Sequence, residues 1–304
     1  MKKTEVYILS GFLGSGKTTL LKRLLEDEKS LGRKVAVMMN ELGKVSIDSD
    51  AIEEDVSLKE LLGGCICCTL QDKLEAQLQG LLVLEKPEVI YIETTGAAHP
   101  VEVLDAILSP LFAHQLIVKG IITTVDGLRW LDRKNLNPQL HQLVLEQVRH
   151  ADFVIINKTD ELTESQQAAI SYEIQALNAN APCLLTTHSQ ISLQSVRKLQ
   201  LSHEREDVKT ISQKDLHLST FVYQFQNEIK QEDFISFLQC LPETIYRIKG
   251  YVKLDSGYPY LFQFSYGMPQ FLKEYMNMPL NVVFIGENVD WKAIKEQLSD
   301  LERS

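Results

Sequence analysis

The chain has 304 residues, of which 44% are hydrophobic and 24% charged, an ordinary globular composition with enough chain for one large core and a smaller domain. Its formal net charge of −10, from 31 basic and 41 acidic residues, argues against a general nucleic-acid or anionic-membrane partner. No apolar run approaches the ~18 residues of a membrane span, and the strand that follows Met1–Thr4 is expected to leave no room for a signal peptide.

The first predicted elements are a buried strand at Val6–Leu9 and a helix at Thr18–Lys29, joined by the sequence GFLGSGKTT. This sequence fits the pattern G-x-x-x-x-G-K-[ST], in which a glycine-rich loop turns backbone N–H groups toward an anion at a helix N-terminus. Lys17 is expected to reach the β- and γ-phosphates, and the Thr18 hydroxyl to ligate Mg²⁺. The predicted phosphate-binding residues are Gly11, Gly14, Ser15, Gly16, Lys17, Thr18 and Thr19. Because an ordinary strand-to-helix turn seldom carries this whole pattern, the chain is predicted to bind a nucleoside triphosphate.

Two acidic residues, Glu41 and Asp48, follow the second predicted strand, Val35–Met39. At the carboxyl end of such a strand they could lie near Mg²⁺ or orient the attacking water, so both are candidate catalytic residues. They could equally be solvated loop acids, which is the commoner fate of carboxylates. Spacing alone leaves the two interpretations open.

Three of the five cysteines, Cys65, Cys67 and Cys68, lie within four residues before a predicted helix at Leu70–Leu84. An odd, clustered set is not a disulfide framework, and thiolates are soft ligands that suit Zn²⁺ or Cu(I). Three such neighbours cannot comfortably bind one tetrahedral ion, so two cysteines with outside ligands are expected. Small buried side chains at a helix start are the plain alternative, and a redox pair is another.

The outside metal ligands could come from Glu41 and from His114, which follows a predicted helix at Val101–Leu108 and lies in a predicted loop. A lone histidine is more often a surface residue than a ligand. The sequence around His114 does not separate these two interpretations.

Glu93 and Gly96 end the predicted strand Val89–Ile92. A carboxylate beside the phosphate loop suits Mg²⁺ or its water shell, and Gly96 could present its N–H to the γ-phosphate. Glutamate in place of aspartate favours an indirect contact through the water shell. The alternative is a plain strand-to-loop turn.

The tetrad Asn157-Lys158-Thr159-Asp160 follows the predicted strand Phe153–Ile156. Asp160 can accept hydrogen bonds from N1–H and the exocyclic amine of guanine, a pair that adenine does not offer, while Asn157 and Lys158 brace the base and the phosphate loop. The alternative is a turn that caps the following helix. The tetrad favours GTP over ATP.

Apolar runs alternate with amphipathic segments as far as about residue 200, which predicts an α/β fold with a doubly wound, mostly parallel sheet and ligands at the carboxyl ends of its strands. Further strands are predicted at Gly120–Val125 and Cys183–Thr186, and further helices at Gln139–Val148 and Glu164–Leu177. Residues 201–215 are polar and charged and are interpreted as a linker between a domain of residues 1–200 and one of residues 216–304. The second domain is predicted to be a smaller α+β unit with antiparallel strands. Its predicted elements are strands at Leu218–Phe225, Ile245–Leu254, Tyr260–Tyr266 and Asn281–Ile285, and helices at Gln231–Cys240 and Asp290–Leu301.

Taken together, the phosphate loop, the C-x-C-C element, the Glu93–Gly96 strand end and the guanine tetrad make the chain resemble the CobW-like GTPases. These form a branch of the P-loop metallochaperones that includes the urease and hydrogenase nickel-insertion factors. The resemblance implies a slow GTPase that binds a transition metal, usually zinc, and passes it to a client apoprotein. It also implies that residues matching Glu41, Cys67 and a histidine near His114 hold the metal. Relatives often have Phe where Leu42 stands, and some carry a histidine-rich metal reservoir that this chain lacks, so delivery is favoured over storage.

The predicted function is therefore a cytoplasmic GTPase that uses GTP, Mg²⁺ and Zn²⁺ and serves a client apo-metalloprotein of unknown identity, with no nucleic-acid or membrane partner. A nucleotide- or metal-dependent homo-oligomer is compatible with this interpretation. Two alternatives stay open. One is a nucleotide-gated adaptor with structural cysteines, and the other is a phosphotransferase acting on a small molecule.

Overall fold

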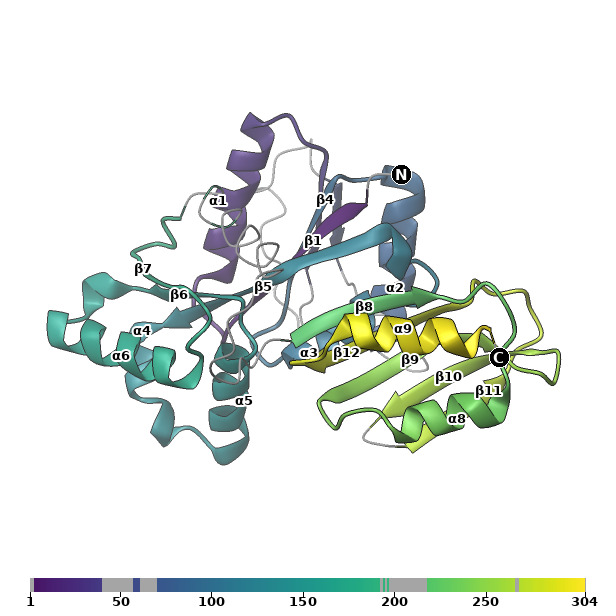
Figure 1. The fold of residues 1–304 in the computed structure, drawn as a ribbon. Coiled ribbons are helices and arrows are strands. Elements are labelled where there is room, and N and C mark those ends of the chain that lie inside the picture. Colours follow the sequence, from purple (N-terminus) through teal and green to yellow (C-terminus); the bar gives the residue numbers. More distant parts are fainter. Residues whose placement is uncertain are drawn as a thin grey trace. The chain divides into compact units, whose positions relative to one another are not determined.

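The computed structural model describes residues 3–39, 57–60, 70–191, 194, 196, 218–265 and 268–303. Two compact units emerge from its contacts. The first comprises Thr4–Val103 and Val118–Leu216, and the second Leu104–Ile117 and His217–Ser304 together with Met1–Lys3. Each unit has its own sheet (Figure 1).

The first unit is built on a seven-stranded sheet in the order β3-β2-β4-β1-β5-β6-β7. β1 pairs with β4, β2 with β3 and β4, and β6 with β5 and β7, all in parallel. Its strands are β1 (Thr4–Ser10), β2 (Val35–Met39), β3 (Ser57–Glu60), β4 (Val89–Glu93), β5 (Leu116–Asp126), β6 (Phe153–Asn157) and β7 (Cys183–Leu185). The predicted doubly wound α/β architecture is confirmed.

Helices connect these strands. They are α1 (Lys17–Ser30), α2 (Leu70–Gly80) with the π-helical turn η2 (Leu81–Glu85), α3 (Pro100–Ile107), η3 (Ala113–Gln115), α4 (Gly127–Leu131), η4 (Arg133–Asn135), α5 (Pro138–Arg149), η5 (Thr159–Glu161) and α6 (Glu164–Leu177). Both α5 and α6 begin at side-chain caps: Asn137 accepts from the Leu140 N–H, and Thr163 forms a capping box with Gln166. Such caps each stabilise a helix by about 1 kcal/mol.

The strands β1, β2, β4 and β6 of the first unit are buried on both faces, which explains why they read as unbroken apolar runs. Adjacent residues of β6 show this arrangement, because their side chains point to opposite faces of the sheet. Ile155 packs in the same cluster as Leu20 and Leu24 of α1. Its neighbour Ile156 packs with Ile170 of α6 in a second cluster. Each such leucine or isoleucine stabilises the fold by roughly 1.5–3 kcal/mol when fully buried.

The second unit contains an antiparallel five-stranded sheet in the order β11-β10-β9-β12-β8, with two helices packed on it (Figure 1). The elements are β8 (Leu218–Gln224), α8 (Gln231–Gln239), β9 (Ile245–Lys253), β10 (Pro259–Ser265), β11 (Met268–Lys273), β12 (Asn281–Glu287) and α9 (Trp291–Leu301). Its core is aromatic, with Phe234, Phe262 and Phe284 fully buried. This is the smaller α+β part that the sequence predicts.

Some elements are absent from the sequence-based prediction. β5 begins at Leu116, four residues before the predicted start, and the short elements β3, α4 and β11 are additional. Within the described residues, no helix combines the length and apolarity that a membrane crossing needs.

Candidate functional site

The loop between β1 and α1 has a backbone that glycine alone accommodates at two positions. Gly11 and Gly16 have φ angles of +131° and +111°, which L side chains rarely adopt. A Cβ on Gly11 would lie 2.1 Å from the Thr124 carbonyl oxygen, and one on Gly16 would lie 2.3 Å from Nδ2 of Asn157. The loop is therefore packed tightly from behind.

α1 begins directly after this loop, with Gly16 as its N-cap. Among the described residues no side chain caps this helix, and its first turn contains no acid. The N–H groups of that turn and the positive end of the helix dipole favour a bound anion. Backbone geometry here matches a phosphate-binding loop.

Lys17 lies across the loop, where its Nζ donates hydrogen bonds to the carbonyl oxygens of Gly11 at 2.8 Å and Phe12 at 3.3 Å. The side chain is only 7% exposed. Burial lowers the pKa of the Lys17 ammonium, and the nearby Glu93 carboxylate partly opposes this by raising it. A cation is thus held at the loop, where it can balance phosphate charge.

Glu93 ends β4 and accepts a hydrogen bond from the Thr18 hydroxyl, Oγ1 to Oε1 at 2.7 Å. The parallel register pairs Glu93 with Leu9 of β1, which places the carboxylate beside the phosphate loop. Hydroxyl and carboxylate oxygens are hard ligands of the kind that Mg²⁺ prefers. The two side chains therefore fit a magnesium ion, held directly or through its water shell.

The chain after Glu93 lies against the phosphate loop. A Cβ on Gly96 would lie 2.5 Å from the Leu13 backbone nitrogen, so only glycine permits this approach. From the other side, buried Gln147 of α5 donates its Nε2 hydrogens to the carbonyl oxygens of Gly96 at 3.1 Å and Ala98 at 3.2 Å. Side chain and loop together fix the position of residues 94–98.

Asn157 joins the guanine tetrad to the phosphate loop. Its Nδ2 donates to the Ser15 carbonyl oxygen at 2.9 Å, and its Oδ1 accepts from the Ser189 N–H at 2.9 Å. Lys158 pairs with Asp126 at 2.6 Å, and Asp160 is exposed in η5. The tetrad thus has a bracing asparagine and a carboxylate open to solvent.

Two residues of this site escape the sequence analysis. Ser189 is fully buried, and its Oγ donates to the Gly16 carbonyl oxygen at 3.2 Å. The second residue is Thr124, whose hydroxyl oxygen lies 2.6 Å from that of the predicted loop residue Ser15. Asn157 ends β6 and Ser189 lies four residues beyond the end of β7, so a position at or just after the carboxyl end of a strand is the signal that could have identified Ser189.

Two family profiles together match nearly the whole chain. The profile of the CobW/HypB/UreG nucleotide-binding domain matches residues 5–185. The chain belongs to the CobW/HypB/UreG family. Residues 218–302 of this family member match the C-terminal domain of the cobalamin synthesis protein cobW.

Among curated relatives, the family member is similar to the zinc chaperone YjiA of Escherichia coli K12, at 34% identity over 202 residues that cover 64% of this chain and 60% of the relative. The zinc chaperone YeiR of the same organism is 35% identical over 167 residues, which cover 54% of this chain and 50% of the relative. Zinc-regulated GTPase metalloprotein activator 1 of Schizosaccharomyces pombe is 29% identical over 318 residues, covering 85% and 74%. The chain thus spans 50–60% of the length of the first two relatives.

Among solved structures, the zinc-bound YjiA GTPase from E. coli covers 99% of both chains, with a TM-score of 0.51 and 22% identity. A zinc-bound triple mutant of the YjiA GTPase gives a TM-score of 0.53 at 24% identity, again over 99% of both chains. At this level of identity the similarity establishes the fold of the CobW/HypB/UreG member.

The predicted metal ligands of this CobW/HypB/UreG protein are described only in part. Glu41 and the three clustered cysteines, Cys65 to Cys68, lie outside the described residues, as does the candidate catalytic residue Asp48. His114 lies exposed in η3, with its Nδ1 3.3 Å from Nδ2 of Asn281 in the same compact unit. Its role as a zinc ligand stays a prediction.

Proposed function

We propose that this CobW/HypB/UreG protein is a slow GTPase that couples GTP·Mg²⁺ binding and hydrolysis to the delivery of zinc to a client apoprotein. The observation that carries the proposal is the assembled phosphate site, where Lys17 crosses the loop and the Thr18 hydroxyl bonds to Glu93. The zinc-chaperone names of the relatives support the metal part.

The nucleotide is proposed to bind along the phosphate loop, from Gly11 to Thr19. Backbone N–H groups and Lys17 would hold the phosphates, with Gly96 near the γ-phosphate. Mg²⁺ at Thr18 and Glu93 would supply positive charge to the phosphate oxygens. Asp160 would read the guanine base, while Asn157 and Lys158 brace it.

Zinc is the proposed cargo, with Glu41, Cys65, Cys67, Cys68 and His114 as its candidate ligands. Thiolates with borderline imidazole and carboxylate ligands suit Zn²⁺. Asp48 and Glu41 are also proposed to act in the loop that responds to the γ-phosphate, as switch loops do. This would link hydrolysis to the metal site.

The client is proposed to be an apo-metalloprotein that receives the ion, and a homo-oligomer that forms with nucleotide or metal fits the same scheme. We propose the cytoplasm as the compartment. An odd, clustered set of cysteines suits a reducing compartment.

Base selection is tested by Asp160→Asn in the full chain. Asparagine can donate to the O2 of xanthine, where guanine carries an amine, so we expect GTP affinity to fall by at least ~10-fold and XTP affinity to rise, given one or two charged hydrogen bonds of about 1.5–3 kcal/mol each. Nucleotide titration and phosphate release with Mg²⁺ measure both. Unchanged GTP binding in this variant would contradict the guanine assignment.

Zinc binding is tested by Cys67→Ser, with Cys240→Ser as the matched control because Cys240 is a free, exposed thiol of the second unit. A zinc titration against a chromophoric chelator should show at least tenfold weaker binding in Cys67→Ser only. Loss of even a hydrogen-bond partner of a metal ligand lowers metal affinity by ~10–100-fold, and Cys67 is a proposed ligand itself. Equal affinities in the two variants would remove the C-x-C-C element from the proposal.

A further inference from the structure

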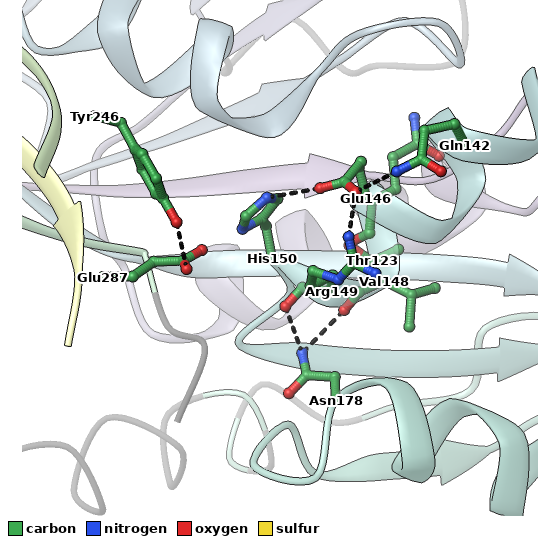
Figure 2. A network of polar contacts seen from close by, with 10 residues as sticks. Thr123, Gln142, Glu146, Val148, Arg149, His150, Asn178, Tyr246 and Glu287 are labelled. Atoms are coloured by element: carbon green, nitrogen blue, oxygen red, sulfur yellow. Dashed lines mark hydrogen bonds and ion pairs between the residues drawn. The ribbon is translucent and has the colours of Figure 1, made fainter. Parts of the chain in front are cut away.

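A second group of potential metal ligands lies apart from the cysteines, in the first unit. His99, Glu146 and His150 each offer one ligand atom, and these atoms all lie within 4.8 Å of one another. Glu146 and His150 come from one face of α5 and its C-cap, at i and i+4. Their Oε2 and Nε2 atoms are 3.0 Å apart (Figure 2). His99 comes from the loop between β4 and α3, with its ring centroid 6.0 Å from that of His150.

We propose that His99, Glu146 and His150 form a binding site for a zinc-class divalent ion, separate from the cysteine site. Two imidazoles and one carboxylate are a donor set that zinc takes with a fourth position left for water or an outside ligand. Metal–ligand bonds of ~2.0–2.2 Å around a tetrahedrally coordinated ion require donor atoms roughly 3.3–3.6 Å apart. The present separations, all within 4.8 Å, lie close to this range.

An ordinary helix end explains part of this cluster. Glu146 also accepts a hydrogen bond from Gln142 at 2.6 Å and pairs with Arg149 (Figure 2), so a glutamate with helix-end partners needs no metal. The third ligand is what this explanation leaves out. His99 is 47 residues away from Glu146 in the sequence and comes from a different element, yet it converges on the same point.

The loop that carries His99 is held in place by α5 itself. Gln147, the neighbour of Glu146, bonds to the carbonyl oxygens of Gly96 and Ala98. On the other side of His99, its carbonyl oxygen accepts from the Val103 N–H at 3.2 Å as α3 begins after it. The backbone on both sides of His99 is therefore fixed, which favours metal binding because little freedom is lost.

The test uses the full chain with Cys65, Cys67 and Cys68 all changed to serine, so that only sites outside the cysteine element are measured. A zinc titration against a chromophoric chelator should show one bound ion. His99→Gln or Glu146→Gln in this background should weaken binding by at least ~10-fold, the lower end of losses at metal sites. The matched control is His141→Gln, on the same helix, which should bind as the parent does. Equal affinity for His99→Gln and His141→Gln would overturn the proposal.

A second measurement needs no histidine variant. Diethylpyrocarbonate labelling of the chain with those three serines, mapped by mass spectrometry with and without Zn²⁺, should show protection of His99 and unchanged labelling of His141. If zinc leaves His99 labelling unchanged, or if this triple variant binds no zinc, the site does not exist. Because the clustered cysteines are absent in both measurements, neither result bears on the cysteine site proposed above.

Discussion

Gly16 lies where three parts of the nucleotide site meet. It caps α1 with φ at +111°, a Cβ on it would meet Nδ2 of Asn157, and its carbonyl oxygen accepts from Ser189. The same asparagine holds the Ser15 carbonyl oxygen. At the scale of single residues, the shape of the phosphate loop therefore depends on buried contacts behind it as much as on its own sequence.

Gly16→Ala should abolish nucleotide binding and lower the free energy of unfolding, because the new Cβ would lie 2.3 Å from Asn157 and a strained φ alone costs about 1–3 kcal/mol. Urea unfolding and titration with a fluorescent GTP analogue measure the two effects. Gly80→Ala is the matched control. Its φ is −58°, and no described heavy atom lies within 4 Å of the position that its Cβ would take, so we expect about 0.4–1 kcal/mol of added stability. A Gly16→Ala protein with parental affinity would be the contrary result.

Cys183 provides a prediction about pH. Burial raises the pKa of its thiol from 9.0 to about 11, so at neutral pH its thiolate is ~100-fold scarcer than that of an ordinary cysteine. Iodoacetamide labelling with peptide mapping should therefore modify Cys240, which is exposed, much faster than Cys183.

The stability contribution of the same thiol has a definite sign. Since the folded-state pKa is the higher one, the contribution is complete below pH 9 and is lost as the pH rises through about 11. The stability difference between the native chain and Cys183→Ala should shrink over that interval. In the labelling experiment, equal rates for Cys183 and Cys240 at pH 7 would contradict the raised pKa of the Cys183 thiol.

At the scale of elements, one side chain fastens the ends of two helices together. Asn178, at the C-cap of α6, donates its Nδ2 hydrogens to the carbonyl oxygens of Val148 at 2.9 Å and Arg149 at 3.0 Å (Figure 2). The same Nδ2 also bonds to the carbonyl oxygen of Ala151 at 2.9 Å. Its Oδ1 accepts from the Ala181 N–H at 3.1 Å. These contacts fix the turn between α5 and β6, and with it the start of the strand that ends in Asn157.

Asn178→Ala should lower the free energy of unfolding by about 1–3 kcal/mol, because it leaves buried carbonyl oxygens without their donor. Denaturant unfolding measures this change. Asn180→Ala, two residues further on and exposed, is the control and should have a small effect. If both variants unfold at the same denaturant concentration, the turn is held by other contacts.

At the scale of the whole molecule, the second unit recruits a segment far away in sequence. Residues 104–117 belong to it by their contacts. The Pro110 carbonyl oxygen accepts from the fully buried Asn281 at 2.8 Å, and Asp105 pairs with Arg247 at 2.9 Å. The unit that contains the antiparallel sheet thus includes a segment that, in the sequence, follows β4 and runs into β5 of the parallel sheet.

A fragment of residues 218–303 should therefore be less stable than the same fragment joined to residues 104–117 through a flexible linker. We expect a difference of about 1–3 kcal/mol, since the fragment alone leaves the buried Asn281 amide without its acceptor. Trp291 is the only tryptophan in either fragment, so its fluorescence reports urea unfolding directly. Identical midpoints would show that residues 104–117 contribute nothing to this unit.

The features predicted correctly are those that depend on residues close together in the sequence. The central strands of the first sheet are buried on both faces and therefore read as apolar runs, as at Val35–Met39. β11 escapes prediction because it is an edge strand whose side chains are mostly exposed, so it has no apolar face to recognise.

Contacts between distant residues could not be predicted in the same way. Ser189 braces Asn157 across 32 residues, and His99 meets His150 across 51, with no local pattern to pair them. Single serines and histidines are common on surfaces, and only the order of strands in the sheet brings these particular ones together. Domain assignment from composition likewise gives no reason to associate residues 104–117 with strands more than 100 positions later.

The hydrogen bond between Thr18 and Glu93 determines where the lone pairs of the threonine oxygen point. A hydroxyl has one hydrogen and two lone pairs, and here the hydrogen is directed to the carboxylate. The lone pairs must then point away from Glu93, so the oxygen is already oriented as a ligand before a cation arrives. A valine at this position would keep the shape and lose the ligand oxygen, whereas a serine would keep the oxygen and lose only a methyl group.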